Sequence, residues 1–239
     1  MHQKTIAFLV FLPLFMALFS CQNTPQSHHG VKEEANILRL LDTTPRQDSR
    51  VLKSAHKHTK KQSQLSEYDK YIKKTAQSIG WDWRLLASLI YQESRFKTEL
   101  ESEKGAYGLM QLMPVVMEQY DIDHDSSPEE QIAAGGKLIR HLDKRLERRV
   151  SDSAQRVKFV LAAYNAGLGH VYDAQRLAEK YGKESDVWND NVDFFILNKS
   201  KSQYYNDTCC RNGYLRGDQT YRFVEEVIKR YHHYKTIID

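Results

Sequence analysis

The sequence has 239 residues, of which 41% are hydrophobic and 28% charged, and its formal net charge is +4 at pH 7. A chain of this length forms one domain of ordinary size with additional segments, and it can bury a substantial core. The charge excludes a generally basic domain, because residues 22–62 hold eight Lys and Arg against four Asp and Glu, whereas residues 63–239 have a net charge of −1.

The first residues have the pattern of a signal peptide. Lys4 precedes an apolar stretch, residues 6–19, which is short for a membrane span. The stretch leads into Leu-Phe-Ser-Cys at residues 18–21, which resembles a bacterial lipobox with an unusually bulky Phe19. We therefore expect residues 1–20 to be a lipoprotein signal peptide and Cys21 to carry the lipid anchor, with a plain secretory signal as the alternative. In such lipoproteins Gln22, in place of Asp, favours the outer membrane.

Residues 21–62 are predicted to form a flexible basic linker. They are rich in Gln, Ser, Thr, His and Lys, and their apolar clusters are too short to close a core. A basic arm can bind nucleic acid, but an exported chain meets none, so no nucleic-acid partner is expected. A tether along anionic phospholipid or wall polymer is one interpretation, and a merely solvated linker is the other.

From residue 66 onward the periodicity predicts a nearly all-α domain over residues 63–239. Expected helices cover residues 66–79, 82–95, 127–146, 157–166, 170–180 and 218–234. Gly80 ends the first, Asp82 caps the second, and Ser127 with Pro128 begins the third. No alternating strand pattern of useful length occurs in the sequence.

Glu93 is an acid on an apolar helix face. It follows Leu86 by seven residues and Leu89 by four, so all three project from the same side of the helix. A carboxylate there loses hydration, which raises its pKa and lets it act as a general acid near neutral pH. The alternative is a buried Glu that is paired with an Arg.

Two further segments have a distinctive composition. Residues 105–114 are GAYGLMQLMP, where two glycines three apart suit a tight loop and Pro114 suits the first turn of a helix. Residues 161–169 are LAAYNAGLG, where small residues pack a helix tightly and Gly167 is suited to a left-handed cap. Taken singly, each segment is also compatible with a structural turn.

In this order and spacing, Glu93-Ser-Arg-Phe, residues 105–114 and residues 163–169 resemble the transglycosylase SLT domain of lytic murein transglycosylases. The resemblance covers roughly residues 66–235 and is strongest to the membrane-bound, lipoprotein type. It implies an all-α, mainly helical, lysozyme-like fold with a cleft, similar to goose-type lysozyme. It also implies cleavage of peptidoglycan glycan strands during cell wall remodelling and turnover, on the periplasmic side of the outer membrane.

The resemblance implies that one acid is enough. Glu93 would protonate the β-1,4 bond between N-acetylmuramic acid and N-acetylglucosamine and then, as a carboxylate, take the proton of the muramic C6 hydroxyl, which closes onto C1 to give a 1,6-anhydro end. Most glycoside hydrolases need a second carboxylate. The candidates by proximity are a predicted helix cap and three acids of a polar loop: Asp82, Glu99, Glu101 and Glu103.

The same resemblance implies substrate-binding roles for five residues. Ser94 would hydrogen-bond near the acid, and Met110 and Gln111 would line the sugar cleft. Tyr164 and Asn165 would do so from the opposite wall. The alternative for both Met110 and Met113 is plain core packing, which we favour for Met113.

One position departs from the family pattern. The last motif of the family ends in Tyr-Val, with the tyrosine hydroxyl in the active site, whereas this chain has Phe223 before Val224. Tyr221 lies two residues earlier, which turns its side chain by about 200° on a helix. Tyr204 and Tyr205 are other candidates for supplying a hydroxyl.

Neither a cofactor nor a metal is expected. Cys209 and Cys210 are adjacent, which disfavours a disulfide between them, and no ligand-spaced His or Cys accompanies them. We interpret them as incidental or as loosely redox-active surface thiols. The expected enzyme is a monomeric lytic transglycosylase; the alternatives are a hydrolytic goose-type lysozyme on the same fold and a non-catalytic peptidoglycan-binding lipoprotein.

Overall fold

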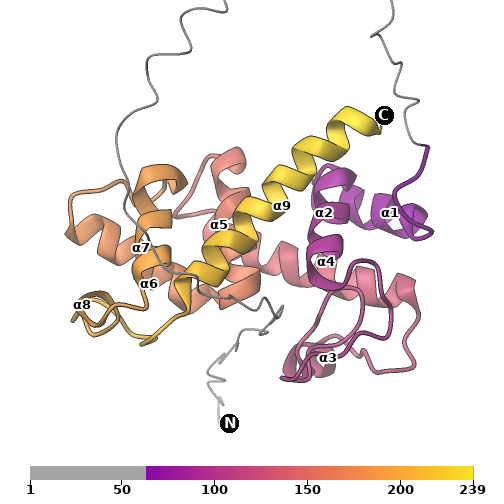
Figure 1. Ribbon diagram of the computed structural model, residues 1–239, viewed down its shortest axis with the longest axis horizontal. Helices are drawn as coiled ribbons and strands as arrows, with labels where there is room; N and C mark the ends of the chain where they lie inside the picture. The colour runs from indigo at the N-terminus through magenta and orange to yellow at the C-terminus, as the bar shows by residue number, and fades with distance from the viewer. Residues whose placement is uncertain (1–62, 239) are drawn as a thin grey trace, which may run out of the picture. The chain divides into compact units, whose positions relative to one another are not determined.

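The structure is a computed structural model that describes residues 63–238. The predicted signal peptide, the linker and Cys21 lie outside the described residues. The helices of the described part are α1 (Asp69–Ile79), α2 (Trp83–Ser94), α3 (Pro114–Gln119), α4 (Pro128–Leu146), α5 (Ser153–Ala166), α6 (Leu168–Lys180), an irregular wide turn η2 (Trp188–Val192), α7 (Asp193–Asn198), α8 (Ser202–Tyr205) and α9 (Gly217–Ile237) (Figure 1).

The predicted mainly helical fold is confirmed. Between residues 63 and 238 no strand forms, and extended pairing is limited to isolated antiparallel bridges around Tyr107, which contacts Glu101 and Leu112. No helix in this part of the chain combines the length and the apolar character needed to cross a bilayer.

Several predicted helix ends agree with the local chemistry. The carboxylate of Asp82 accepts the backbone N–H of Arg84 at 2.9 Å and caps α2. Ser127 and Glu130 form a reciprocal capping box at the start of α4. Gly167 ends α5 with a positive φ of 94°, which favours glycine, but its ψ of 143° lies outside the expected left-handed helical region. Its position as the junction between α5 and α6 explains this, because the chain must leave one helix and enter the next at once.

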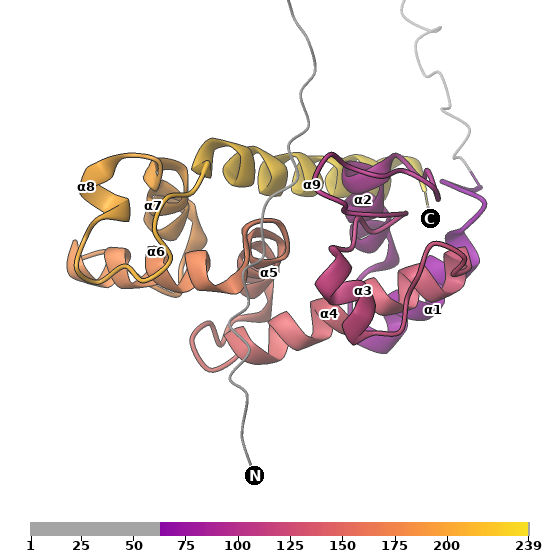
Figure 2. The same ribbon diagram turned by 90° about the horizontal axis from the view of Figure 1, so that it is seen from below.

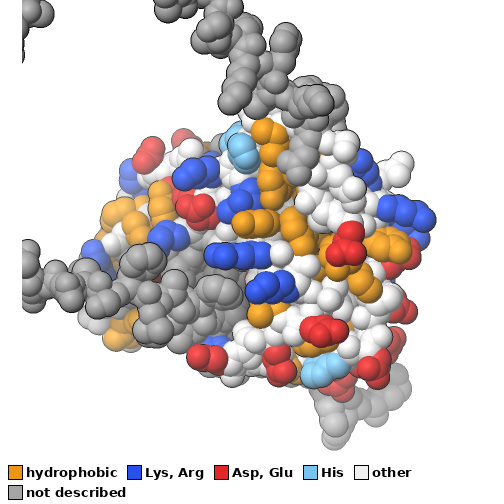
Figure 3. Space-filling model, turned by 45° about the vertical axis from the view of Figure 1, so that its right-hand side comes forward, with side chains coloured by type: hydrophobic (Ala, Val, Ile, Leu, Met, Phe, Trp, Pro, Cys, Tyr) orange, Lys and Arg blue, Asp and Glu red, His pale blue; other side chains and the backbone are white. Residues whose placement is uncertain are grey.

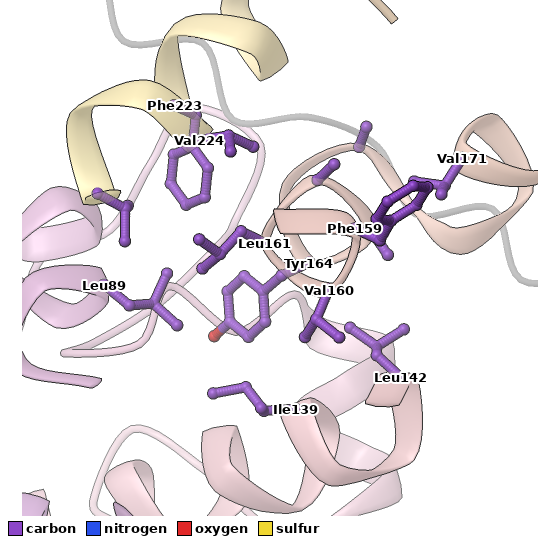
Figure 4. Close-up of a cluster of buried hydrophobic side chains, with 14 of the residues drawn as sticks. Leu89, Ile139, Leu142, Phe159, Val160, Leu161, Tyr164, Val171, Phe223 and Val224 are labelled. Carbon is purple, nitrogen blue, oxygen red and sulfur yellow. The ribbon is translucent and has the colours of Figure 1, made fainter. Parts of the chain in front are cut away.

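Helix α5 forms the centre of the core. It packs against α4, α6 and α9, and in Figure 2 it lies between α9 and α4. Its second half is buried on all sides, and Figure 4 shows Leu161 and Tyr164 pointing toward Leu89 of α2, while Phe223 of α9 closes the cluster. Helix α9 also packs along α2. The end of α2, the end of α5 and the middle of α9 are thereby brought together.

Candidate active site

A cavity of about 400 Å³ opens where these three helices meet. It is lined by the last turn of α2 and the loop after it, by the loop before α3, by the end of α5 and by α9: Tyr91, Gln92, Glu93, Ser94, Arg95, Lys97, Leu100, Gln111, Asn165, Gln219, Arg222, Phe223, Glu226 and Arg230. Three of the residues predicted to bind substrate are among these, namely Ser94, Gln111 and Asn165.

Glu93 lies in the last turn of α2 with 8% of its surface exposed. Burial raises the pKa of its carboxyl group from 4.5 to about 8, so the group holds its proton at neutral pH. The partial negative charge of the carbonyls at the end of α2 also disfavours a carboxylate there. Within residues 63–238 the carboxyl group forms no ion pair, which excludes the alternative of a buried Glu paired with a described Arg.

The loop that forms one wall, residues 105–112, is shaped by its backbone. Gly108 has φ 76°, and a Cβ atom there would lie 2.2 Å from Oε1 of Gln131. That same oxygen accepts the backbone N–H of Leu109 at 2.9 Å, so only glycine allows the loop to approach α4 this closely. Gln111 also has a positive φ, 47°, which places its side chain at the cavity.

Two of the predicted binding residues hold this loop in place. The Ser94 hydroxyl lies 2.9 Å from the carbonyl oxygen of Leu109, and the Tyr164 hydroxyl lies 2.6 Å from the carbonyl oxygen of Met110. Both hydroxyls donate to adjacent carbonyls of one segment. Ser94 still borders the cavity, whereas Tyr164 does not line it. These hydroxyls therefore tie the ends of α2 and α5 to the loop.

The side chain of Met110 does not lie where the sequence predicted. It is fully buried and packs against α4, where Gly135 leaves room for it: a Cβ atom at residue 135 would lie 2.3 Å from the Met110 Cε. The loop turns at Gly108 and directs this side chain inward, so it supports the wall from behind instead of lining the cleft. Met113 is partly buried against the core, in agreement with its assignment to packing.

The two amide side chains of the site differ in their freedom. Gln111 donates through Nε2 to the carbonyl oxygens of Leu100 at 2.8 Å and Gly108 at 3.1 Å, which fixes the side chain. Asn165 has a buried Oδ1 without a hydrogen-bond partner. Because a buried polar atom without a partner is costly, Oδ1 of Asn165 is available for a donor that enters the cavity.

Phe223 lines the cavity and leaves it without a tyrosine hydroxyl at that place. Tyr221 lies on the other side of α9 and lines a different cavity together with Tyr204. Tyr205 packs edge to face on Tyr214. None of the three tyrosines that were candidates for supplying the hydroxyl borders the Glu93 cavity.

The candidates for a second carboxylate are also absent from the cavity wall. Asp82 is occupied as the cap of α2 and as the ion-pair partner of Arg84 at 2.9 Å. The acids of the polar loop at residues 99, 101 and 103 do not line the cavity. The acid that does, besides Glu93, is Glu226 on α9.

The sequence placed Phe223 of α9 at the site but did not identify the polar residues of the same helix. Gln219, Arg222, Glu226 and Arg230 are spaced by three or four residues and so share one helix face, which lines the cavity together with the adjacent Phe223. This spacing could have been found in the sequence, because it is a polar stripe next to the buried stripe. What it could not reveal is that this polar stripe faces α2.

The described residues offer no cluster of three or more His, Cys, Asp and Glu that could hold a metal ion. Cys209 and Cys210 are free thiols that are only partly exposed. Burial raises the pKa of the Cys209 thiol to about 12, which opposes formation of the reactive thiolate.

The sequence is similar to those of known proteins. Residues 70–187 match the model of the Transglycosylase SLT domain. The chain is 36% identical over 171 residues to "Membrane-bound lytic murein transglycosylase F" of Pseudomonas fluorescens, covering 72% of this chain and 34% of the relative. It is 37% identical over 171 residues to the protein of the same name from Marinobacter nauticus, covering 72% and 33%. The chain thus spans about a third of the length of these curated relatives. A solved structure of an inactive mutant of the lytic transglycosylase Slt from Pseudomonas aeruginosa superposes with a TM-score of 0.47 at 20% identity, covering 71% of this chain and 24% of that one.

Proposed function

Because the chain belongs to the transglycosylase SLT domain family, we propose that it is a lytic transglycosylase that cleaves the β-1,4 bond between N-acetylmuramic acid and N-acetylglucosamine in peptidoglycan. The observation that carries the proposal is the state of Glu93: a carboxyl group that keeps its proton at neutral pH and borders a cavity. Such a group can deliver a proton to a departing sugar oxygen, which is otherwise too basic to leave.

In the proposed reaction, Glu93 gives its proton to the bridging oxygen as the bond from that oxygen to C1 of the muramic residue breaks. The oxygen of the 2-acetamido group supports the positive charge that develops at C1. The Glu93 carboxylate then takes the proton of the C6 hydroxyl, whose oxygen bonds to C1 and closes the 1,6-anhydro ring. Glu93 regains its proton and no water is consumed.

The other residues of the site act on the substrate or on the wall. Asn165, with its unpartnered Oδ1, would accept an N–H or O–H of a sugar substituent, and Gln111 would present its amide from the opposite wall. Ser94 and Tyr164 would hold the loop between them in the geometry that the sugar requires.

The decisive experiment compares the wild-type chain with Glu93→Gln on purified peptidoglycan. The variant keeps the shape of the side chain and removes the acid, so we expect a loss of lysis of at least a hundredfold, in line with removal of a general acid. Mass spectrometry of the soluble products should show 1,6-anhydromuramic ends for the wild-type chain. Unchanged lysis in the variant would rule out Glu93 as the acid.

A hydrolytic lysozyme on the same fold is the second candidate, and Glu226 is the observation that favours it, because it is a second carboxylate on the wall of the same cavity. A hydrolase would use it to activate water, in the manner of the two-carboxylate enzymes. Reducing muramic ends that disappear in Glu226→Gln would establish hydrolysis. Anhydro ends that persist in that variant would exclude it.

The place of action is part of the proposal. The curated relatives above are named membrane-bound, and the lipobox-like residues before Cys21 suggest a lipid anchor in the outer membrane that faces the periplasm. There the enzyme would act alone on glycan strands in wall remodelling and turnover. Metabolic labelling with palmitate tests the anchor, since Cys21→Ala should abolish both the label and sedimentation with membranes.

A further inference from the structure

Positive charges are concentrated on the rim of the cavity. Its lining includes Arg95 and Lys97 from the loop after α2 and Arg222 and Arg230 from α9. Of these, Arg222 is paired with Asp218 at 2.6 Å, whereas the other three form no ion pair with any residue between 63 and 238. Figure 3 shows more broadly that Lys and Arg side chains gather beside hydrophobic ones on one face of the molecule.

Arg230 is held by contacts with two aromatic side chains. Its guanidinium lies 3.9 Å from the centre of the Tyr91 ring, which is a close cation–π contact. Its side chain also hydrogen-bonds to Tyr234, whose pKa is nevertheless raised because burial outweighs the charge and the hydrogen bond of Arg230. Its Nε is buried without a hydrogen-bond partner. The guanidinium is therefore fixed in position by two tyrosines, while its charge is not balanced by a carboxylate of the described chain.

The catalytic acid does not neutralise this charge. A nearby cation would lower the pKa of Glu93, but burial is the cause that acts on it, and the pKa is raised to about 8. With Glu93 protonated, Glu226 is the one negative charge among the lining residues, against four positive ones. The cavity thus has an uncharged end for the reacting bond and a cationic wall.

We propose that Arg230, together with Arg95 and Lys97, forms a subsite for a carboxylate carried by the muramyl substituent of the glycan strand. This inference rests on the proposed function, because it assumes that a strand of murein occupies the cavity. A guanidinium held flat by an aromatic ring presents its N–H groups in a fork that matches a carboxylate. N-acetylglucosamine, which alternates with muramic acid along the strand, has no charged substituent and would gain no binding energy from this wall. The subsite would therefore determine which sugar of the strand lies beside Glu93.

The carboxylate has two possible sources with the same chemistry. In an intact strand the lactyl carboxyl group of muramic acid is in amide linkage, and the carboxylates belong to the stem peptide. In a strand stripped of peptide the lactyl carboxylate itself is free. Three soluble strands of equal length separate these sources: one with native stems, one with the stem carboxylates converted to primary amides, and one without stems.

Binding of the three strands to the full chain is measured in the Glu93→Gln background, so that the readout does not depend on cleavage. We expect the strand with native stems to bind about tenfold more tightly than the amidated strand, the effect of one hydrogen-bonded charge pair. Addition of Arg230→Gln should remove this preference. Arg222→Gln is the matched control. It removes from the same wall a cation that is already paired with Asp218, so the preference should remain.

The outcomes separate the subsite from the catalytic proposal. Equal weakening of native and amidated strands by Arg230→Gln would mean that Arg230 only packs against Tyr91, and would overturn the subsite. The subsite is also overturned if the Glu93→Gln chain with Arg230 intact binds neither the native nor the stripped strand more tightly than the amidated strand. If Arg230→Gln weakens binding of the stripped strand alone, the subsite is supported and the lactyl carboxylate is its ligand. If the chain with Glu93 intact does not lyse peptidoglycan but the binding preference is present, the proposed enzymatic activity is overturned and the subsite is supported.

Discussion

The hydroxyl of Tyr164 donates a hydrogen bond of 2.6 Å to the carbonyl oxygen of Met110, which precedes it by 54 residues. The pair joins the central helix α5 to the loop that walls the cavity, and both groups are buried. The hydroxyl of Ser94, on α2, makes the equivalent bond to the carbonyl oxygen of Leu109, the residue before Met110. Two helices therefore fix consecutive carbonyls of the same loop, and the position of Gln111 depends on both.

Tyr164→Phe tests this link. Removal of the hydroxyl leaves the Met110 carbonyl without its buried donor, so we expect the free energy of unfolding to fall by about 1–3 kcal/mol. Urea denaturation measures this. Tyr172→Phe is the matched control, because the Tyr172 hydroxyl donates to the carbonyl of Arg145 at 3.1 Å in an exposed position and its loss should cost little. Equal effects of the two substitutions would contradict a special role for the Tyr164 bond.

The raised pKa of Glu93 makes stability depend on pH. Between pH 4.5, its ordinary pKa, and about 8, its pKa in the folded chain, the folded state binds a proton that the unfolded state has released. The free energy of unfolding therefore falls as the pH rises through this range. The total loss is on the order of 5 kcal/mol.

This contribution is isolated by comparison with Glu93→Gln, which has no proton to lose. We expect the variant to gain in stability relative to the wild type as the pH rises from 5 to 8, and the difference to level off above that. Denaturation of both chains at pH 5, 7 and 9 gives the result. Parallel pH profiles would show that the carboxyl group is ionised in the folded chain, and the general-acid role would fall with it.

How far the sequence predicts this site depends on the range of the interactions. Helix α2 and the placement of Glu93 follow from local features, an apolar stripe and the Asp82 cap, and α3 begins at Pro114 as expected. The direction of the Met110 side chain does not follow from local features, because it is determined by the space that Gly135 leaves on another helix. The motif resemblance identified residues that matter, but only the fold distinguishes a side chain that borders the cavity from one that holds its wall.

The segment between α6 and α9 was not predicted as helical. Its helices α7 and α8 have six and four residues, too few for a periodic pattern, and Asp190 within η2 has a positive φ of 59°. They are stabilised by packing against other elements, in particular α7 against α9. A buried charge cluster that the sequence could not reveal also fixes this region: Asp173 of α6 and Lys199 are fully buried and lie 2.8 Å apart.

That cluster predicts a strong effect on stability. Burial alone would raise the pKa of Asp173, but Lys199 and the backbone N–H groups of Arg211 and Asn212 outweigh it and hold the pKa below its ordinary value. Lys199→Met removes the buried cation but leaves Asp173 with Arg176 and the two backbone N–H groups, so we expect a loss in the free energy of unfolding at the lower end of about 3–5 kcal/mol. The control, Lys74→Met, breaks an exposed pair with Glu129 and should cost under about 1 kcal/mol. A comparable small loss at both sites in thermal or urea denaturation would contradict the assignment.

Phe223→Tyr tests the position at which this chain departs from the family pattern. The ring is 7% exposed and lines the cavity with Glu93, so an added hydroxyl would place a hydrogen-bond donor at a wall that also holds the unpartnered Oδ1 of Asn165. We expect kcat/KM for peptidoglycan to rise about two- to tenfold, the worth of one neutral hydrogen bond. Tyr221→Phe is the control, because its hydroxyl lies on the far side of α9, and it should leave kcat/KM unchanged. A fall in activity with unaltered stability in Phe223→Tyr would mean instead that the cavity requires an apolar ring at this position.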